Sequence, residues 1–259
     1  MSVRRRAARL LGAATVTTLA VTGLGVALGP ASTGAAQAST DKKDQPAQVS
    51  EMPAGVVGRT ASVPVPEVAR QQDTDFAAGG GLPDGARVFN TGANASGMAL
   101  AAGGLAHGAA EAPGAAGFVE AKLKGKVRYL GARVRFAGAA SGSVALVGWK
   151  SSLVDADRAG AGTPATGMRL VASPGRWELT VVDGEVHVIG SGTYELTDGP
   201  ATFELVRDGG RLYVVDPAGA VTLVEDKRAD RLAGPWASWG LSETGPEQLP
   251  AVIEAAWAG

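Results

Sequence analysis

The sequence contains no cysteine, and this absence removes several kinds of chemistry at once. Without thiols there can be no disulfide, no thiolate metal ligand, no cysteine nucleophile and no lipid-modified cysteine. Histidine is almost as scarce, since His107 and His187 are the two that occur. Any folded domain must therefore be held by its own hydrophobic core, and the chain of 259 residues is long enough to bury one.

Motifs for cofactors and for nucleophilic catalysis are lacking as well. The glycine clusters lie in low-complexity sequence, and none stands between a strand and a helix as a phosphate or dinucleotide loop requires. There is no Gly-x-Ser-x-Gly elbow, and Gly190-Ser191-Gly192 is more typical of a bulge or turn. The sequence therefore predicts no cofactor. It favours a protein without catalytic activity but leaves that question open.

Carboxylates spaced two residues apart are the remaining pattern that suits a metal ion. Asp73 and Asp75 form one such pair, and Asp155 and Asp157 form another. A hard cation accepts this spacing, but neither pair has the further oxygen ligands of a dedicated calcium loop. We interpret both pairs as solvated loop acids and predict no metal site.

Residues 1–38 have the pattern of a secretory signal peptide. Four arginines between positions 4 and 9 precede an uncharged stretch, Leu10–Leu28, and Ala36-Gln37-Ala38 supplies the small residues of a cleavage site. An uncleaved anchor is the alternative, because the stretch is just long enough to span a bilayer, although threonine and glycine dilute it. We expect the protein to be secreted and to act outside the cell, either free or associated with the cell wall.

The charge of the remaining chain bears on its partners. The sequence carries 24 basic and 25 acidic residues. Four basic and no acidic residues lie in 1–38, which leaves 20 basic and 25 acidic residues, a net charge of −5. A mildly acidic surface is poorly suited to nucleic acid. We therefore expect no nucleic-acid partner and, after cleavage, no membrane span.

Two stretches have the composition of irregular chain. Residues 39–84 contain several prolines, a triple glycine and few large apolar side chains, which predicts a disordered linker. Such a linker suits a domain held away from a membrane or threaded through a wall, or it has no further role. Residues 94–117 are rich in alanine and glycine and predict a loop.

From Phe118 onward, apolar and polar residues alternate with a period of two, as in strands with one buried and one solvated face. Turn sequences separate these runs at Asp183-Gly184, at Asp208-Gly209-Gly210 and at Asp216–Gly219. Residues 85–259 are thus predicted to form an all-β domain, an antiparallel sandwich of jelly-roll type. The residues predicted to face its core are Trp177, Leu179, Val181, Phe203, Leu205, Val134 and Phe136.

The succession of strands resembles the jelly-roll domains of the concanavalin A-like lectin and glucanase superfamily, including laminin-G-like domains. The resemblance rests on five segments: Ser143–Trp149, Ser173–Val181, Gly199–Leu205, Gly210–Val214 and Gly234–Trp239. It implies a curved sheet whose concave face often holds carbohydrate. The superfamily includes lectins, glycosidases, lyases and adhesion modules, so the fold alone does not give the function.

Glycanases of this superfamily usually carry paired acids on one strand, in a Glu-x-Asp-x-x-Glu arrangement, and no such strand occurs here. The nearest acids, Glu195, Asp198 and Glu204, are interpreted as solvated hairpin residues. The leading hypothesis is therefore a secreted, non-catalytic, lectin-like module that binds a glycan or an anionic cell-envelope polymer. A glycan-active enzyme with acids assembled from separate strands, and a structural or adhesion protein of the envelope, remain alternatives.

Two surfaces are candidates for ligand binding. Trp236 and Trp239 are three residues apart, so in a strand they face opposite sides, and the exposed one can stack on a sugar ring. The alternative is that both side chains pack against the protein. The second candidate is a cationic stripe that includes Lys122, Lys124, Arg133 and Arg135, predicted on the outward phase of two successive strands. The stripe could attract an anionic polymer, or it could protect a sheet edge from pairing with other chains.

Overall fold

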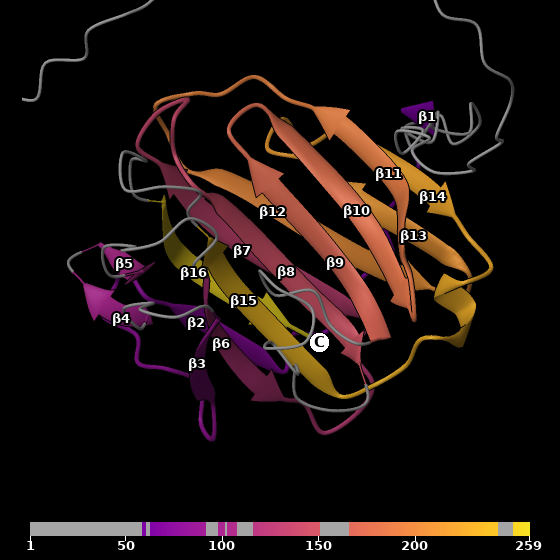
Figure 1. Cartoon of the computed structure of the whole chain (residues 1–259), viewed down its shortest axis with the longest axis horizontal. Coiled ribbons are helices and arrows are strands. Elements are labelled where there is room, and N and C mark those ends of the chain that lie inside the picture. The colour runs from indigo at the N-terminus through magenta and orange to yellow at the C-terminus, as the bar shows by residue number, and fades with distance from the viewer. Residues whose placement is uncertain are drawn as a thin grey trace, which may run out of the picture. The chain divides into compact units, whose positions relative to one another are not determined.

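The computed structural model describes residues 59–60, 63–91, 98–101, 103–107, 116–150, 166–242 and 251–259. The expected signal peptide, residues 39–58 of the expected linker, and Asp155 and Asp157 lie outside the described residues. The described part contains two antiparallel sheets and a short 3-10 helix, η1 (Ala229–Arg231), with no α-helix (Figure 1). Across these same ranges, no helix is long and apolar enough to cross a membrane.

The first layer is a nine-stranded sheet. Strand β2 (Gln72–Asp75) lies off the main path and pairs with β16. The other eight strands, in spatial order, are β1 (Arg59–Thr60), β14 (Val221–Glu225), β13 (Arg211–Val215), β12 (Ala201–Asp208), β7 (Tyr129–Phe136), β16 (Ala251–Ala258), β5 (Gly104–His107) and β4 (Met98–Ala101).

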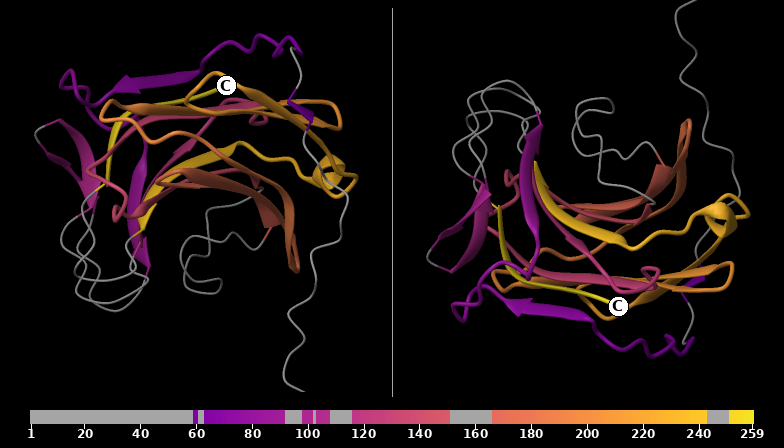
Figure 2. Two further views of the ribbon diagram at one scale, coloured as in Figure 1. Left: turned by 90° about the horizontal axis from the view of Figure 1, so that it is seen from above. Right: turned by 90° about the horizontal axis from the view of Figure 1, so that it is seen from below.

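The second layer is a seven-stranded sheet. Its strands, in spatial order, are β11 (Val186–Thr193), β10 (Arg176–Asp183), β9 (Thr166–Ser173), β8 (Ser143–Lys150), β15 (Trp236–Ser242), β6 (Ala116–Lys122) and β3 (Arg87–Thr91). Figure 2 shows this sheet bending away from the nine-stranded sheet towards both of its edges, β3 and β11. Its outer face is therefore concave.

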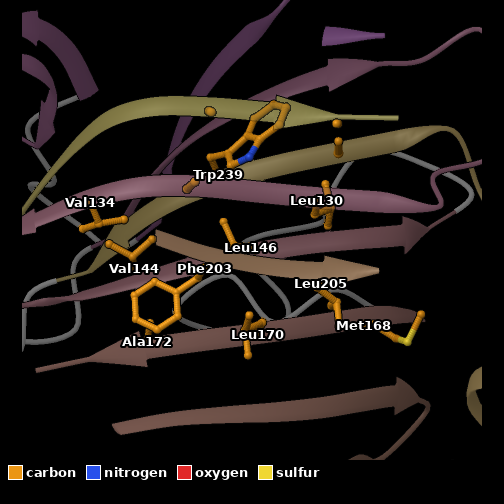
Figure 3. Close-up of a cluster of buried hydrophobic side chains, with 14 of the residues drawn as sticks. Leu130, Val134, Val144, Leu146, Met168, Leu170, Ala172, Phe203, Leu205 and Trp239 are labelled. Carbon is orange, nitrogen blue, oxygen red and sulfur yellow. The ribbon is translucent and has the colours of Figure 1, made fainter. Parts of the chain in front are cut away.

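The hydrophobic core fills the space between the two sheets. All seven residues predicted to face the core are buried there, and Trp177, Leu179 and Phe203 are at most 3% exposed. Figure 3 shows side chains from both layers meeting, for example Leu130 and Val134 of β7 with Leu146 of β8. The prediction of an antiparallel β-sandwich is thus confirmed.

The predicted turns also connect the strands as expected. Asp183-Gly184 links β10 to β11, and Gly184 has a φ of 110°, a conformation that favours glycine. In the turn between β13 and β14, the Asp216 carboxylate accepts hydrogen bonds from the backbone N–H groups of Ala218 and Ala220, both at 2.9 Å. Local turn chemistry therefore sets the register of these hairpins.

The prediction of a disordered linker is wrong for residues 63–84, which the structure includes in the sandwich. Here β2 pairs with β16, and Val63, Val65 and Val68 pack on the outer face of the nine-stranded sheet. They meet an apolar cluster that contains Tyr129 and Trp257. The prolines that indicated disorder instead keep the chain extended across this cluster.

The predicted loop at 94–117 is likewise too long. Strands β4 and β5 form a hairpin within it, and β6 begins at Ala116. Alternation of side chains is hard to detect where most residues are alanine and glycine, which is why the sequence pattern gave no strand here.

Removing residues 1–84 is therefore expected to destabilise the domain, whereas removing residues 1–58 is not. The first deletion takes away β2, three partly buried valines and Phe76, which is buried in the core, and we expect a loss of about 3–4 kcal/mol in the free energy of unfolding. Urea unfolding of the two truncated chains measures the difference. Equal midpoints would mean that residues 59–84 contribute nothing to stability.

Candidate functional site

The concave outer face of the seven-stranded sheet is the candidate site. Its side chains alternate with those of the core, because each strand presents every second residue outward. The charged strand residues on this face are Arg87, Glu120, Lys122, Lys150, Arg169, Arg176 and Glu178. Five are cationic and two are anionic, although the whole chain has a net charge of −1.

A groove of about 500 Å³ lies on this face over β9, β10 and β11. Such a volume is within the range of about 300–1,000 Å³ that is usual for small-ligand sites. The lining mixes guanidinium, carboxylate, hydroxyl and aliphatic groups. Its members are Arg169, Val171, Ser173, Arg176, Trp177, Glu178, Val188, Ser191, Gly192 and Thr193.

The chemistry of the groove comes from residues that point away from the core. Ser191 and Thr193 of β11 present exposed hydroxyl groups, and Val188 is 48% exposed. Trp177 lies beneath the groove with its indole against Gly192, where a Cβ atom would be 2.7 Å from the ring. The groove thus offers hydrogen-bond donors and acceptors beside an aliphatic surface.

The two groove arginines differ in their surroundings. Burial lowers the pKa of the Arg169 guanidinium, and the charge of Glu178 partly opposes that shift. Arg176 is exposed and begins β10, two residues before Glu178. Within the described ranges no carboxylate lies within 4 Å of the Arg176 guanidinium, so its charge is available to a ligand.

A buried polar cluster lies near the centre of the same face. The ammonium of Lys150 forms an ion pair with Glu120, and it donates a hydrogen bond to the Ser238 hydroxyl at 2.6 Å. That hydroxyl donates in turn to the Glu120 carboxylate at 2.7 Å. Glu120 lies on the polar phase of its alternating strand, yet Glu120, Lys150 and Ser238 are at most 2% exposed.

A β-bulge brings Lys150 to this face. Opposite Trp236 and Ser238, the register of β8 shifts between Val147 and Lys150. Trp149 has a φ of 58°, which is uncommon for a residue other than glycine. The extra residue lets Trp149 enter the core while Lys150 points outward to Glu120. Burial lowers the pKa of Lys150 to about 8, and the charge of Glu120 opposes the shift.

The structure separates the two candidate tryptophans as their spacing requires. Trp239 is 1% exposed, lies in the core and donates from Nε1 to the backbone carbonyl of Gly131 at 3.0 Å. Trp236 is half-buried on the concave face, and the ammonium of Lys122 lies 5.6 Å from the centre of its ring. Trp236 is thus the one of the pair that a ligand can reach.

The expected single cationic stripe is wrong, because its members belong to different sheets. Lys122 lies on β6 of the seven-stranded sheet, and exposed Lys124 follows that strand. Arg133 and Arg135 lie on β7 of the nine-stranded sheet and point to its outer face. Successive strands of the sequence cross from one layer to the other here, so a shared outward phase does not mean a shared surface.

Arg133 and Arg135 are also neutralised where they lie. Both contact the buried carboxylate of Glu254, and Arg133 also lies 3.1 Å from Asp75. A backbone N–H from Ala78 and the Arg133 guanidinium lower the pKa of Asp75. These ion pairs tie β2, β7 and β16 together and indicate a structural role.

Among the described side chains, His187 and the remaining predicted acids lie apart from one another. Glu204 accepts a hydrogen bond from the Tyr129 hydroxyl on the nine-stranded sheet, and exposed Glu195 and Asp198 lie between β11 and β12. His187 lies 3.2 Å from Asp183 at one end of β11. Within the described ranges, no group of three or more such residues is placed to hold a metal ion.

No protein-family model and no curated protein sequence matches the chain. Solved structures do resemble it in fold. A Bacillus subtilis protein of unknown function with a galectin-like fold has a TM-score of 0.55 and 11% sequence identity, covering 75% of this chain and 97% of that one.

Two carbohydrate-recognition structures have similar TM-scores and sequence identities to this chain. The VIP36 exoplasmic/lumenal domain, in a form bound to Ca²⁺ and Man2, has a TM-score of 0.52 and 12% identity over 66% of this chain and 80% of its own. The carbohydrate recognition domain of Emp47p has a TM-score of 0.51 and 15% identity, covering 71% of this chain and 92% of that domain. The described domain therefore has the lectin-type jelly-roll fold, as the resemblance of its strands implied.

Proposed function

We propose that this protein is a glycan-binding module that holds its ligand on the concave face of the seven-stranded sheet. The observation that carries the proposal is the groove over β9, β10 and β11, in which hydroxyl and guanidinium groups adjoin aliphatic side chains. Sugars present the same combination, with hydroxyl groups around a ring that has apolar faces. The lectin-type fold of the neighbouring structures supports this assignment.

Trp236 extends the proposed surface towards the opposite ends of the strands. It pairs with Lys150 across β8 and with Lys122 across β6, whereas the groove lies nearer the β9–β10 turn. An extended oligosaccharide could contact both regions of the face. Arg133 and Arg135 are not part of this surface, because they lie on the other sheet.

Binding without cleavage is favoured by the carboxylates of the groove. Retaining and inverting glycosidases place two carboxyl groups on opposite sides of the scissile bond, about 5–10 Å apart. Among the described residues that line the groove, Glu178 is the one that carries a carboxylate. The enzyme alternative would require a second acid that reaches the groove from elsewhere.

Blocking the groove is expected to weaken binding without unfolding the domain. We propose screening the full chain on a glycan array and then measuring the affinity of Ser191→Tyr for the best ligand by calorimetry. The tyrosine would occupy the groove, and we expect affinity to fall by about tenfold or more, roughly 1.4 kcal/mol. Arg211→Tyr, at an exposed position of the other sheet, is the matched control.

Trp236→Ala tests the second region of the face in the same titration. Loss of an aromatic stacking partner should weaken binding by roughly 1–3 kcal/mol, by analogy with bases stacked on aromatic side chains. If neither Ser191→Tyr nor Trp236→Ala changes affinity for an array-positive glycan, the concave face is not the binding surface.

We further propose that the protein works outside the cell, on the basis of the charge and hydropathy pattern of residues 1–38. The N-terminus of the processed protein should then be Ser39, directly after Ala36-Gln37-Ala38. N-terminal sequencing of protein recovered from culture medium measures it. An N-terminus upstream of Leu28, or protein retained in the cytoplasm, would contradict secretion.

A further inference from the structure

We infer that the groove is specific for acidic glycans, that is, oligosaccharides whose sugars carry a carboxylate, and that Arg176 contacts this group. The inference rests on the proposed function, because it names the class of ligand for the same groove. Its first basis is the sign of the charge on the concave face, where five cationic strand residues accompany two carboxylates.

The second basis is a contrast between the two outer faces. On the outer face of the nine-stranded sheet, three arginines have carboxylate partners: Arg133 and Arg135 contact Glu254, and the Arg211 guanidinium lies 3.1 Å from the Glu225 carboxylate. On the concave face, neither Arg176 nor Lys122 has a carboxylate within 4 Å in the described part of the chain. In the described part of the chain, the charges of Arg176 and Lys122 are therefore not cancelled by a neighbouring carboxylate, whereas that of Lys150 is paired with Glu120.

The third basis is the place of these charges within the groove. Arg176 and Arg169 both line it, and Glu178 is the carboxylate that offsets them. In the ladder between β9 and β10, Arg169 pairs with Thr180 and Arg176 pairs with Ser173. The two arginines are therefore four residues apart along the strand direction, which places their Cα atoms about 14 Å apart. A guanidinium presents a planar pair of donors to a carboxylate, which gives both orientation and strength.

Burial adds to the preference. Arg169 is half-buried, and this partial removal from water strengthens the attraction of its guanidinium for an anion that enters the groove. The exposed hydroxyls of Ser191 and Thr193 remain for neutral parts of the sugar. A neutral glycan would use the hydroxyls, whereas an acidic one would also use the guanidinium groups.

The test compares each acidic oligosaccharide with its own methyl ester, which keeps the sugar and removes the charge. The probes are oligogalacturonate and hyaluronan oligosaccharides and their esters, titrated calorimetrically into the full chain. We expect each bound acid form to be preferred over its ester by about tenfold, as for a hydrogen bond to a charged group. The preference should shrink from low to physiological ionic strength, as the Debye length falls from about 30 to about 8 Å.

Three variants assign the effect to residues. Arg176→Gln should remove most of the preference for the acid form over its ester, and Glu178→Gln should increase the affinity for the acid form. Arg211→Gln, which alters an arginine of the other sheet, should change neither. Equal affinities for acid and ester, or binding of neutral glycans alone on the array, would overturn the inference while the proposed function stands. Binding to no glycan of any kind would overturn the proposed function itself.

Discussion

Replacing Lys150 with methionine is expected to lower the free energy of unfolding by about 3–5 kcal/mol, because one partner of a buried ion pair is removed. Lys150 is 2% exposed and Glu120 is fully buried, and both contact the hydroxyl of Ser238. Without the ammonium, the Glu120 carboxylate remains in an environment from which water is excluded. Urea unfolding followed by tryptophan fluorescence measures the loss.

Replacing both charges should restore most of that stability. In Glu120→Leu/Lys150→Met the pair becomes apolar at similar volume, a change that is often neutral or stabilising. Lys122→Met is the matched control, because Lys122 lies two residues from Glu120 on the same strand but is exposed, so its effect should stay within about 0.5 kcal/mol. A double variant no more stable than Lys150→Met would mean that the cluster is held by packing rather than by charge.

The ion pair should also give a specific dependence of stability on pH. Burial lowers the pKa of Lys150 to about 8 from its ordinary 10.5, so between these values the unfolded chain binds more protons than the folded one. The contribution of Lys150 therefore increases with pH from 8 to 10.5. Burial raises the pKa of Tyr129 and of Tyr194 to about 12, which acts in the opposite direction above pH 10. The lysine effect should be visible between pH 8 and 10 and absent from Lys150→Met.

The core could be predicted from the sequence because period-two alternation and turn residues are local signals. Trp177, Leu179 and Val181 face inward as their spacing indicates, and the Asp183-Gly184 turn fixes the hairpin that carries them. A bulge breaks such a pattern without leaving a clear trace in the sequence. Simple alternation from Val147 would turn Lys150 inward, and the extra residue at Trp149 reverses this.

The pairing of strands could not be predicted from local sequence patterns, because it depends on contacts between residues that are distant in the sequence. Strands β6 and β7 follow each other in the chain, yet β6 pairs with β3 and β15, while β7 pairs with β12 and β16. The cationic stripe failed for this reason. The groove was missed as well, because its lining comes from three strands of one face and none of its residues is unusual alone.

Composition misled the interpretation of the segment before β3. Few apolar residues and several prolines indicated a linker, but three valines and the buried Phe76 suffice when apolar surfaces are already in place to receive them. Gly131 helps to make that surface, because any Cβ atom there would lie 2.1 Å from the indole of Trp257. The residues that hold the segment in place belong to the sheet. The composition of the segment alone therefore could not show that it would be ordered.

Trp239→Ala should cost about 3–5 kcal/mol in the free energy of unfolding, as expected for the loss of a buried aromatic side chain. Trp239 is among the largest fully buried side chains and contacts the core from β15 (Figure 3). Its indole N–H also donates to the Gly131 carbonyl, so the substitution leaves a cavity and an acceptor that has lost its donor. Trp239→Phe keeps most of the volume and should recover part of the loss.

Trp236 is the natural comparison, because it lies on the same strand and differs from Trp239 mainly in the face it occupies. It is half-buried beside Lys122, and Trp236→Ala should reduce stability far less than Trp239→Ala while weakening glycan binding. Urea unfolding and glycan titration of the two variants therefore separate the two faces of one strand. If Trp236→Ala were the more destabilising change, the inward and outward phases of β15 would be reversed. Ser238 would then point to the core, and the concave face would lose both its aromatic residue and its buried ion pair.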